Sequence, residues 1–161
     1  MTFQALKSIS EILNDFLKKK LNTNESKVIL NRVVNADGSL PKENENKIVF
    51  TLINIEEEIS LQQTSLKVDT TNKIGKNFPT IYILVHSNFE YYAESLKLLD
   101  VTIDFFIENP IFNAASSPNF PVELERVRLE PINLTIEEIC NLWSSIGAKY
   151  QPSVLYRVRI A

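Results

Sequence analysis

The residues best suited to chemistry are a single histidine, a single cysteine, a run of glutamates and two pairs of arginines. His86 closes an apolar strand pattern and precedes Ser87, so we expect an exposed or capped side chain at a strand end. No nucleophile-elbow pattern is present, so a serine triad is not indicated. Cys140 lies between Ile139 and Leu142, where a small buried apolar side chain is expected.

Metal and cofactor sites are not indicated either. One histidine and one cysteine cannot complete a zinc site without carboxylates, and no ligand-type spacing occurs. Three glycines in total leave no phosphate-cradling loop. Because the titratable clusters that reaction sites need are missing, we expect no catalytic residues, no metal, no cofactor and no enzymatic activity.

The glutamate run, Glu56 to Glu58, ends an apolar strand pattern. Alternate side chains of a strand point to opposite faces, so only Glu56 and Glu58 converge. Three interpretations stay open: a solvated strand end, a charged protein interface and a cation site.

The arginines are few and unusually placed. Four of the five form same-face pairs, Arg126 with Arg128 and Arg157 with Arg159. Neighbouring strands would bring the pairs together or set them opposite the glutamates. The pattern predicts either a solvated salt-bridge ladder or a charged seam between subunits. The candidate interface residues are Glu56, Glu58, Arg126, Arg128, Arg157 and Arg159.

Hydrophobic periodicity predicts the elements that must position these residues. Helices are expected over 3–21, 90–108 and 135–147, and the last has a capping box at Thr135 and Glu138 and ends at Gly147. Strands are expected over 27–34, 47–59, 80–86, 126–129 and 152–160. A turn at Asp37-Gly38 joins the first two strands.

This order, α-β-β-β-α-β-α-β, fits one α/β sandwich domain over residues 1–161. We expect a mixed, mainly antiparallel sheet of about five strands with three helices. Residues 60–78 are rich in polar side chains and predict a flexible loop or β-arm, unusually long for a compact domain, which suggests that it binds something. Trp143, the sole tryptophan, is expected either in the core or at a binding hot spot.

The bulk properties are those of an ordinary globular protein, with 44% hydrophobic and 23% charged residues. A net charge of -3 offers no general attraction to a polyanion, so we expect no nucleic-acid partner. No apolar run approaches the ~20 residues of a membrane helix, so we expect no direct membrane insertion. No targeting segment is apparent, which predicts synthesis and assembly in the cytoplasm.

Three stretches of the chain carry a family resemblance. They are residues 47–58, 88–112 and 141–161, and they follow an N-terminal helix in a fixed order. Together with that helix they span nearly the whole chain. In this order they resemble the tail-terminator (cap) protein family of phage-tail-like extracellular contractile injection systems.

The resemblance implies a structural cap protein that forms a ring, a homohexamer, on the distal end of the inner tube and sheath and ends polymerisation. Its partners would be itself and the sheath and inner-tube subunits, and the candidate arginines and glutamates would lie at an oligomer or sheath interface. Strand exchange with the sheath would use the 60–78 arm or the strand at 152–160.

Two matters stay open within this resemblance. The particle, assembled in the cytoplasm, would be either released or kept with the cell. The alternative function is an adaptor or assembly factor of the same particle that is not a permanent component of the ring.

Overall fold

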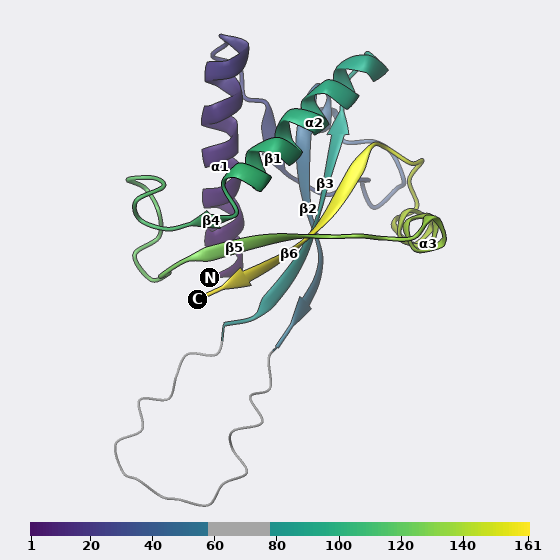
Figure 1. Cartoon of the computed structure of the whole chain (residues 1–161). Helices are drawn as coiled ribbons and strands as arrows, with labels where there is room; N and C mark the ends of the chain where they lie inside the picture. Colours follow the sequence, from purple (N-terminus) through teal and green to yellow (C-terminus); the bar gives the residue numbers. More distant parts are fainter. Residues whose placement is uncertain (58–77) are drawn as a thin grey trace, which may run out of the picture.

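The computed structural model of the chain describes residues 1–57 and 78–161. Within these ranges a mixed sheet of six strands, in the order β1-β2-β3-β6-β5-β4, carries helices on both faces (Figure 1). The helices are α1 (Thr2–Leu21), α2 (Tyr92–Glu108) and α3 (Ile136–Ile146), with a short 3-10 turn η1 (Lys42–Asn44). The strands are β1 (Val28–Leu30), β2 (Lys47–Glu56), β3 (Thr80–Asn88), β4 (Ile111–Phe112), β5 (Val127–Ile132) and β6 (Ser153–Ile160).

The predicted fold class is confirmed, with one more strand than the five expected. The additional strand, β4, has only two residues, directly after Pro110, and pairs with the start of β5. So short a strand leaves no periodicity to read in the sequence. The predicted arm at 60–78, apart from Phe78, lies outside the described residues, as does Glu58.

The strand at 152–160 was predicted as a candidate for exchange with the sheath, and its place in the sheet does not support that role. β6 pairs with β3 on one side and with β5 on the other, both antiparallel. From Leu155 to Arg159 both edges of its backbone are therefore occupied within the fold, so this part of the strand would have to leave the sheet to pair with another protein.

Strand β3 separates two layers of apolar side chains. Ile81, Ile83 and Val85 point to the face covered by α1 and α2, where they join the larger core cluster. Leu84 points the other way and packs in a smaller cluster with Trp143 of α3. The period-two alternation of a strand therefore decides which helix each residue meets.

An aromatic cluster holds α2 against the sheet and links distant parts of the chain. Phe106 of α2 makes edge-type contacts with Tyr156 of β6 and Phe112 of β4, at centroid distances of 5.2 and 6.2 Å. The ring centroid of Phe105 lies 4.6 Å from that of Phe16 of α1. Such pairs contribute about 0.5–1.5 kcal/mol beyond the area they bury, so they fix both helices on one face.

The buried face of α2 differs from the face that the spacing of its apolar residues predicts. Leu96 and Ile107 are 40% and 67% exposed, although their spacing suggests an inward stripe. Thr102 is fully buried instead, and its hydroxyl donates to the Leu98 carbonyl at 2.8 Å. A threonine that satisfies its own hydroxyl within the helix can replace an apolar residue in the core.

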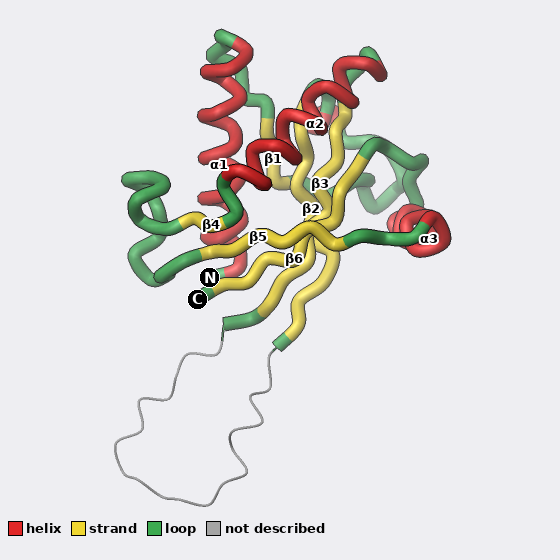
Figure 2. The backbone as a smooth tube through the Cα atoms, in the orientation of Figure 1, coloured by secondary structure: helices red, strands yellow, loops and turns green. Residues whose placement is uncertain are grey.

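Strands β1 and β2 are parallel rather than a hairpin. The predicted turn does form, with Gly38 at φ 84° and its N–H donating to the Asn35 carbonyl. Residues 31–46 nevertheless form a crossover of the length that parallel pairing needs. Its anchor is Asn44, which is buried and accepts from Asn31 Nδ2 at 2.8 Å while donating to the Arg32 carbonyl at 2.9 Å. This loop and the connection between β4 and β5 are drawn as loop segments in Figure 2.

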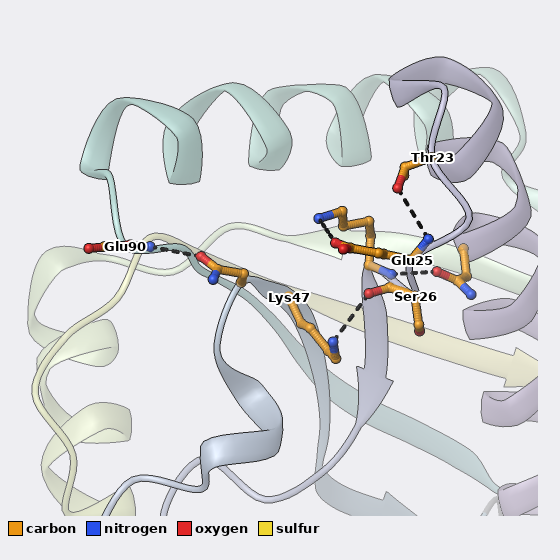
Figure 3. Close-up of polar contacts among 8 residues, drawn as sticks. Thr23, Glu25, Ser26, Lys47 and Glu90 are labelled. Atoms are coloured by element: carbon orange, nitrogen blue, oxygen red, sulfur yellow. Dashed lines mark hydrogen bonds and ion pairs between the residues drawn. The ribbon is translucent and has the colours of Figure 1, made fainter.

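Side chain-to-backbone hydrogen bonds set the start of β1 after α1 ends (Figure 3). Asn22 ends the helix in the left-handed region at φ 50°. Asn14 then accepts from the Lys27 N–H at 2.7 Å, which holds the incoming strand against the helix. Lys47 of β2 donates to the Ser26 carbonyl at 3.2 Å, and this bond links the beginnings of the two parallel strands.

Helix α3 covers part of the second face of the sheet and confirms its predicted caps. Thr135 and Glu138 form the capping box, and Gly147 closes the helix at φ 79°. Trp143 is 3% exposed, as the core interpretation predicts, and its Nε1 donates to Ser153 Oγ at 3.3 Å. Cys140 is exposed, so its predicted burial is wrong, because it lies one turn after the outward-facing Ile136.

The prediction for His86 is also wrong. The strand continues to Asn88, and His86 is 2% exposed, with its backbone paired to Val49 and Ser153. Its ring makes an edge contact with Trp143 at 5.7 Å, and its buried Nδ1 has no hydrogen-bond partner among the described residues. Burial lowers the pKa of His86 to about 4, so the imidazole is neutral in the folded protein near pH 7.

Trp143→Ala is expected to reduce the free energy of unfolding by about 3–5 kcal/mol, because the lost indole leaves a large cavity under α3. Urea titration followed by circular dichroism measures this loss. Ile136→Ala is the control on the same helix, since Ile136 is 83% exposed and its loss should stay within about 0.5 kcal/mol. A Trp143 loss under about 1 kcal/mol would contradict core packing.

Acid is expected to destabilise the fold through His86. Its pKa falls from 6.5 when unfolded to about 4 when folded, so the unfolded state binds more protons between these values. The contribution of neutral His86 to the free energy of unfolding is therefore fully present above pH 6.5 and is lost progressively as the pH falls towards 4. This group should account for a loss of about 2 kcal/mol between pH 8 and pH 5.

Urea titrations of the wild type and a His86→Leu variant at both pH values isolate that contribution. Proton NMR of the single histidine gives its pKa directly. Equal acid losses in the two proteins, or a His86 pKa near 6.5, would refute the assignment.

Candidate functional site

The candidate site is the part of the second sheet face that carries charged rather than apolar side chains. Leu84 of β3 packs beneath α3, whereas Tyr82, two residues earlier on the same face, joins a polar network. The cross-strand pairs of Tyr82 continue this network into β6 and β5. We call it the arginine face and define it by Glu56, Tyr82, Arg128, Glu130, Arg157 and Arg159.

In one row of the arginine face, a neutral, a positive and a negative side chain follow one another across three strands. Tyr82, Arg157 and Glu130 are direct neighbours in the register of β3, β6 and β5. Arg157 Nε donates to Tyr82 Oη at 3.3 Å, and the Tyr82 hydroxyl donates to Glu56 Oε2 at 2.9 Å. The guanidinium carbon of Arg157 also lies 5.7 Å from the centroid of the Tyr82 ring. The polar side chains of this row therefore find partners within the chain itself.

The electrostatics of Arg157 follow from these contacts. The hydrogen bond to the Tyr82 side chain is the main cause that raises the pKa of Arg157, and the charges of Glu130 and Glu56 add to it. Arginine is charged under all ordinary conditions, so the contacts orient the side chain rather than change its state.

The next row places like charges side by side. Arg159 of β6 lies directly opposite Arg128 of β5, and the neighbours beyond them are Thr80 on β3 and Ile111 on β4. Like charges in direct cross-strand register are destabilising. A nearby carboxylate can relieve this repulsion.

Glu130 is that carboxylate, and three arginines share it. Its oxygens lie 3.2 Å from Arg128 Nε, 3.5 Å from Arg159 Nε and 3.8 Å from Arg157 Nη1. The Glu130 side chain is 27% exposed, whereas those of Arg128 and Arg159 are 58% and 52% exposed. The Glu130 side chain is therefore mostly covered, and the guanidinium groups around it still reach solvent.

A depression of about 290 Å³ lies beside the like-charged row. Arg126, Arg128 and Arg159 line it, and none of the described side chains in its wall is acidic. The remaining lining is mainly apolar. We call it the arginine pocket, lined by Phe78, Thr80, Ile111, Arg126, Arg128, Arg159, Ile160 and Ala161.

The structure thus brings most of the predicted residues together. Arg128, Arg157 and Arg159 meet at Glu130, and Arg126 joins two of them at the pocket. Glu56 joins the network by accepting the hydrogen bond from Tyr82, and its charge also acts on Arg157. Glu58 lies outside the described residues.

Sequence reasoning missed the two residues that organise the network. Glu130 follows Arg128 at same-face spacing, which was a usable signal. Tyr82 offered no such signal, because it lies in an apolar strand. Its partner Arg157 is set by the pairing of β3 with β6.

A second pocket, of about 380 Å³, lies against His86. The connection between β1 and β2 and the turn after α3 form its walls, through residues such as Val33, Pro41 and Ala148. None of the described residues lining it is Ser, Cys, Asp or Glu, so the imidazole has no hydroxyl or thiol nucleophile and no orienting acid among them.

Within residues 1–57 and 78–161, no group of three or more His, Cys, Asp or Glu side chains is placed to hold a metal ion. Among the helices of those ranges, none has the length and apolar character needed to cross a membrane.

Comparison with known proteins decides the family. Residues 8–161 match the family described as the Pvc16 N-terminal domain. The chain belongs to the Pvc16 N-terminal domain family. The resemblance to tail-terminator proteins is thereby confirmed.

A solved structure shows where the fold of this Pvc16 N-terminal domain recurs. The sheath/tube terminator of an extracellular contractile injection system, PVC, in its extended state, is similar with a TM-score of 0.51. The match covers 92% of this chain at 14% identity, so it shows a shared fold. The chain spans 54% of that terminator's length. No curated protein sequence matches the chain.

Glu130→Gln is expected to lower the free energy of unfolding by about 1–2 kcal/mol at low salt, because three guanidinium groups lose their shared counter-charge. Glu11→Gln is the control, since it removes one exposed helical pair, Lys7–Glu11 at 3.7 Å, worth about 0.3–0.5 kcal/mol. Urea titration at low and high salt measures both. High salt should shrink the Glu130 effect, and a loss no larger than that of Glu11→Gln would show that the network adds nothing.

Proposed function

We propose that this chain is the domain of a structural terminator that forms a ring on the distal end of the tube and sheath of a contractile injection particle and ends polymerisation there. The ring is a homohexamer, and its partners are the sheath and inner-tube subunits. The function is structural, with no substrate turned over. The match to the Pvc16 N-terminal domain family over residues 8–161 is the observation that supports this most strongly.

The physical task of such a protein is to satisfy the last ring of a polymer. A stack of identical rings exposes at its growing end the same surfaces that bind the next ring. A ring of a different subunit that covers these surfaces without reproducing them stops further addition. Binding of this kind needs a complementary surface rather than a reaction site.

The arginine face supports such a docking role. It carries three arginines and two glutamates, a small positive excess on a chain whose net charge is -3, and the side chains of Arg128 and Arg159 reach solvent. Charge complementarity of this kind fixes register and orientation between protein partners. We therefore assign contact with the particle or with the neighbouring protomer to this face.

Deletion of the coding gene tests the function. Without the terminator, tubes and sheaths should lose their uniform length and their closed distal ends, as seen by electron microscopy of purified particles. A plasmid copy of the gene should restore both. Particles of ordinary length with intact ends in the deletion strain would overturn the proposal.

Protein analysis of the purified particles separates the permanent ring from a transient adaptor. A ring component remains in the particle at constant ratio to the sheath, whereas an assembly factor is absent from finished particles. Light scattering of the isolated chain adds the mass of any preformed ring.

A further inference from the structure

We propose that the arginine pocket binds an acidic side chain of an extended segment from a partner protein in the particle. The proposal rests on the function proposed above and specifies the chemistry of the contact. The occupant is a segment with alternating carboxylate and apolar side chains, and its carboxylate inserts between Arg126, Arg128 and Arg159.

The direct Arg128–Arg159 register is the first reason. A cross-strand pair of guanidinium groups has side-chain origins about 4.5–5.5 Å apart and repels in the isolated chain. Glu130 is the carboxylate that reaches both, and Arg157 shares it as well. A second carboxylate placed from outside would neutralise the pair.

The shape of the pocket is the second reason. Arg126, Arg128 and Arg159 line it together with Ile111, which is 44% exposed. A guanidinium group offers a planar fork of donors that matches a carboxylate, and the apolar wall suits the methylene stem or the neighbouring side chain of an extended peptide. In an extended segment, residues two apart share a face, so alternating acids can reach the same surface.

A protein segment fits this surface better than a nucleic acid. Glu130 lies at the centre of the arginine face and Glu56 at its margin, and both would repel the continuous charge of a phosphate backbone, whereas a peptide can place a single carboxylate away from them. Tight nucleic-acid binding uses six or more phosphate contacts along a basic track, about twice the number of arginines in this pocket.

A peptide titration tests the pocket directly. The probe is a capped peptide, Gly-Glu-Leu-Glu-Leu-Glu-Gly, with its glutamine counterpart as the neutral control. The chain has five arginines, so their side-chain Nε–H signals can be resolved and assigned by NMR. The acidic probe should shift Arg126, Arg128 and Arg159, leave Arg32 unchanged, and lose affinity as salt is added.

Arg159→Glu separates binding from folding. The substitution places a carboxylate opposite Arg128, so the repulsion is removed and the stability of the folded state should be maintained. Affinity for the acidic probe should nevertheless fall at least about tenfold. Arg32→Glu is the matched control, because Arg32 is exposed on the connection after β1 and should bind the probe as the wild type does.

Three outcomes of the titration would overturn the proposal. Equal binding of the acidic and glutamine probes would remove the carboxylate from the contact. Unchanged affinity in Arg159→Glu would remove the pocket. A single-stranded oligonucleotide that shifts the same arginines more strongly than the acidic probe would assign the surface to nucleic acid instead.

Co-sedimentation with particles from the deletion strain keeps this inference distinct from the proposed function. Wild type and Arg32→Glu should sediment with the particles, and Arg159→Glu should remain in the supernatant. Sedimentation of all three proteins would reject the pocket and leave the terminator function standing. Failure of the wild type to sediment would count against the terminator function, and the peptide titration would still decide the pocket.

Discussion

Strand β3 is buried along most of its length, and the rest of the structure depends on covering both of its faces. It lies between β2 and β6, with apolar side chains pointing to each side of the sheet. Such a strand is stable only as the centre of a layered structure. Helices α1 and α2 cover one face through a large aromatic and aliphatic cluster, and α3 covers the other through Trp143 and Leu84.

Among the described residues, one short α-helix, α3, packs on the second face, and this has a direct consequence. α3 lies over the end of β3 that carries Leu84 and His86, and the end that carries Tyr82 has charged neighbours instead. The chain supplies three arginines and one shared glutamate there rather than another apolar layer. A sheet face of this kind is stable in water and still keeps charge available for a partner, which suits a protein whose proposed task is docking.

The errors of sequence reasoning have identifiable physical causes. Cys140 and Trp143 are both apolar in type, but a helix that packs on one side exposes one of them. His86 looks like a strand end because Ser87 and Asn88 follow, yet both continue the ladder with β2. The Asp37-Gly38 turn forms as predicted, but Asn44 anchors a crossover that no turn signal announces.

The sequence by itself determined the helices, five of the six described strands in outline, the caps of α3 and the same-face pairing of the arginines, because these depend on periodicity and local hydrogen bonding. The tertiary structure alone decided which strands are neighbours and in which register. That choice set Arg128 opposite Arg159, gave Glu130 to three arginines and buried the only histidine. Register depends on packing between segments that are far apart in the chain, so the sequence of one segment alone does not determine it.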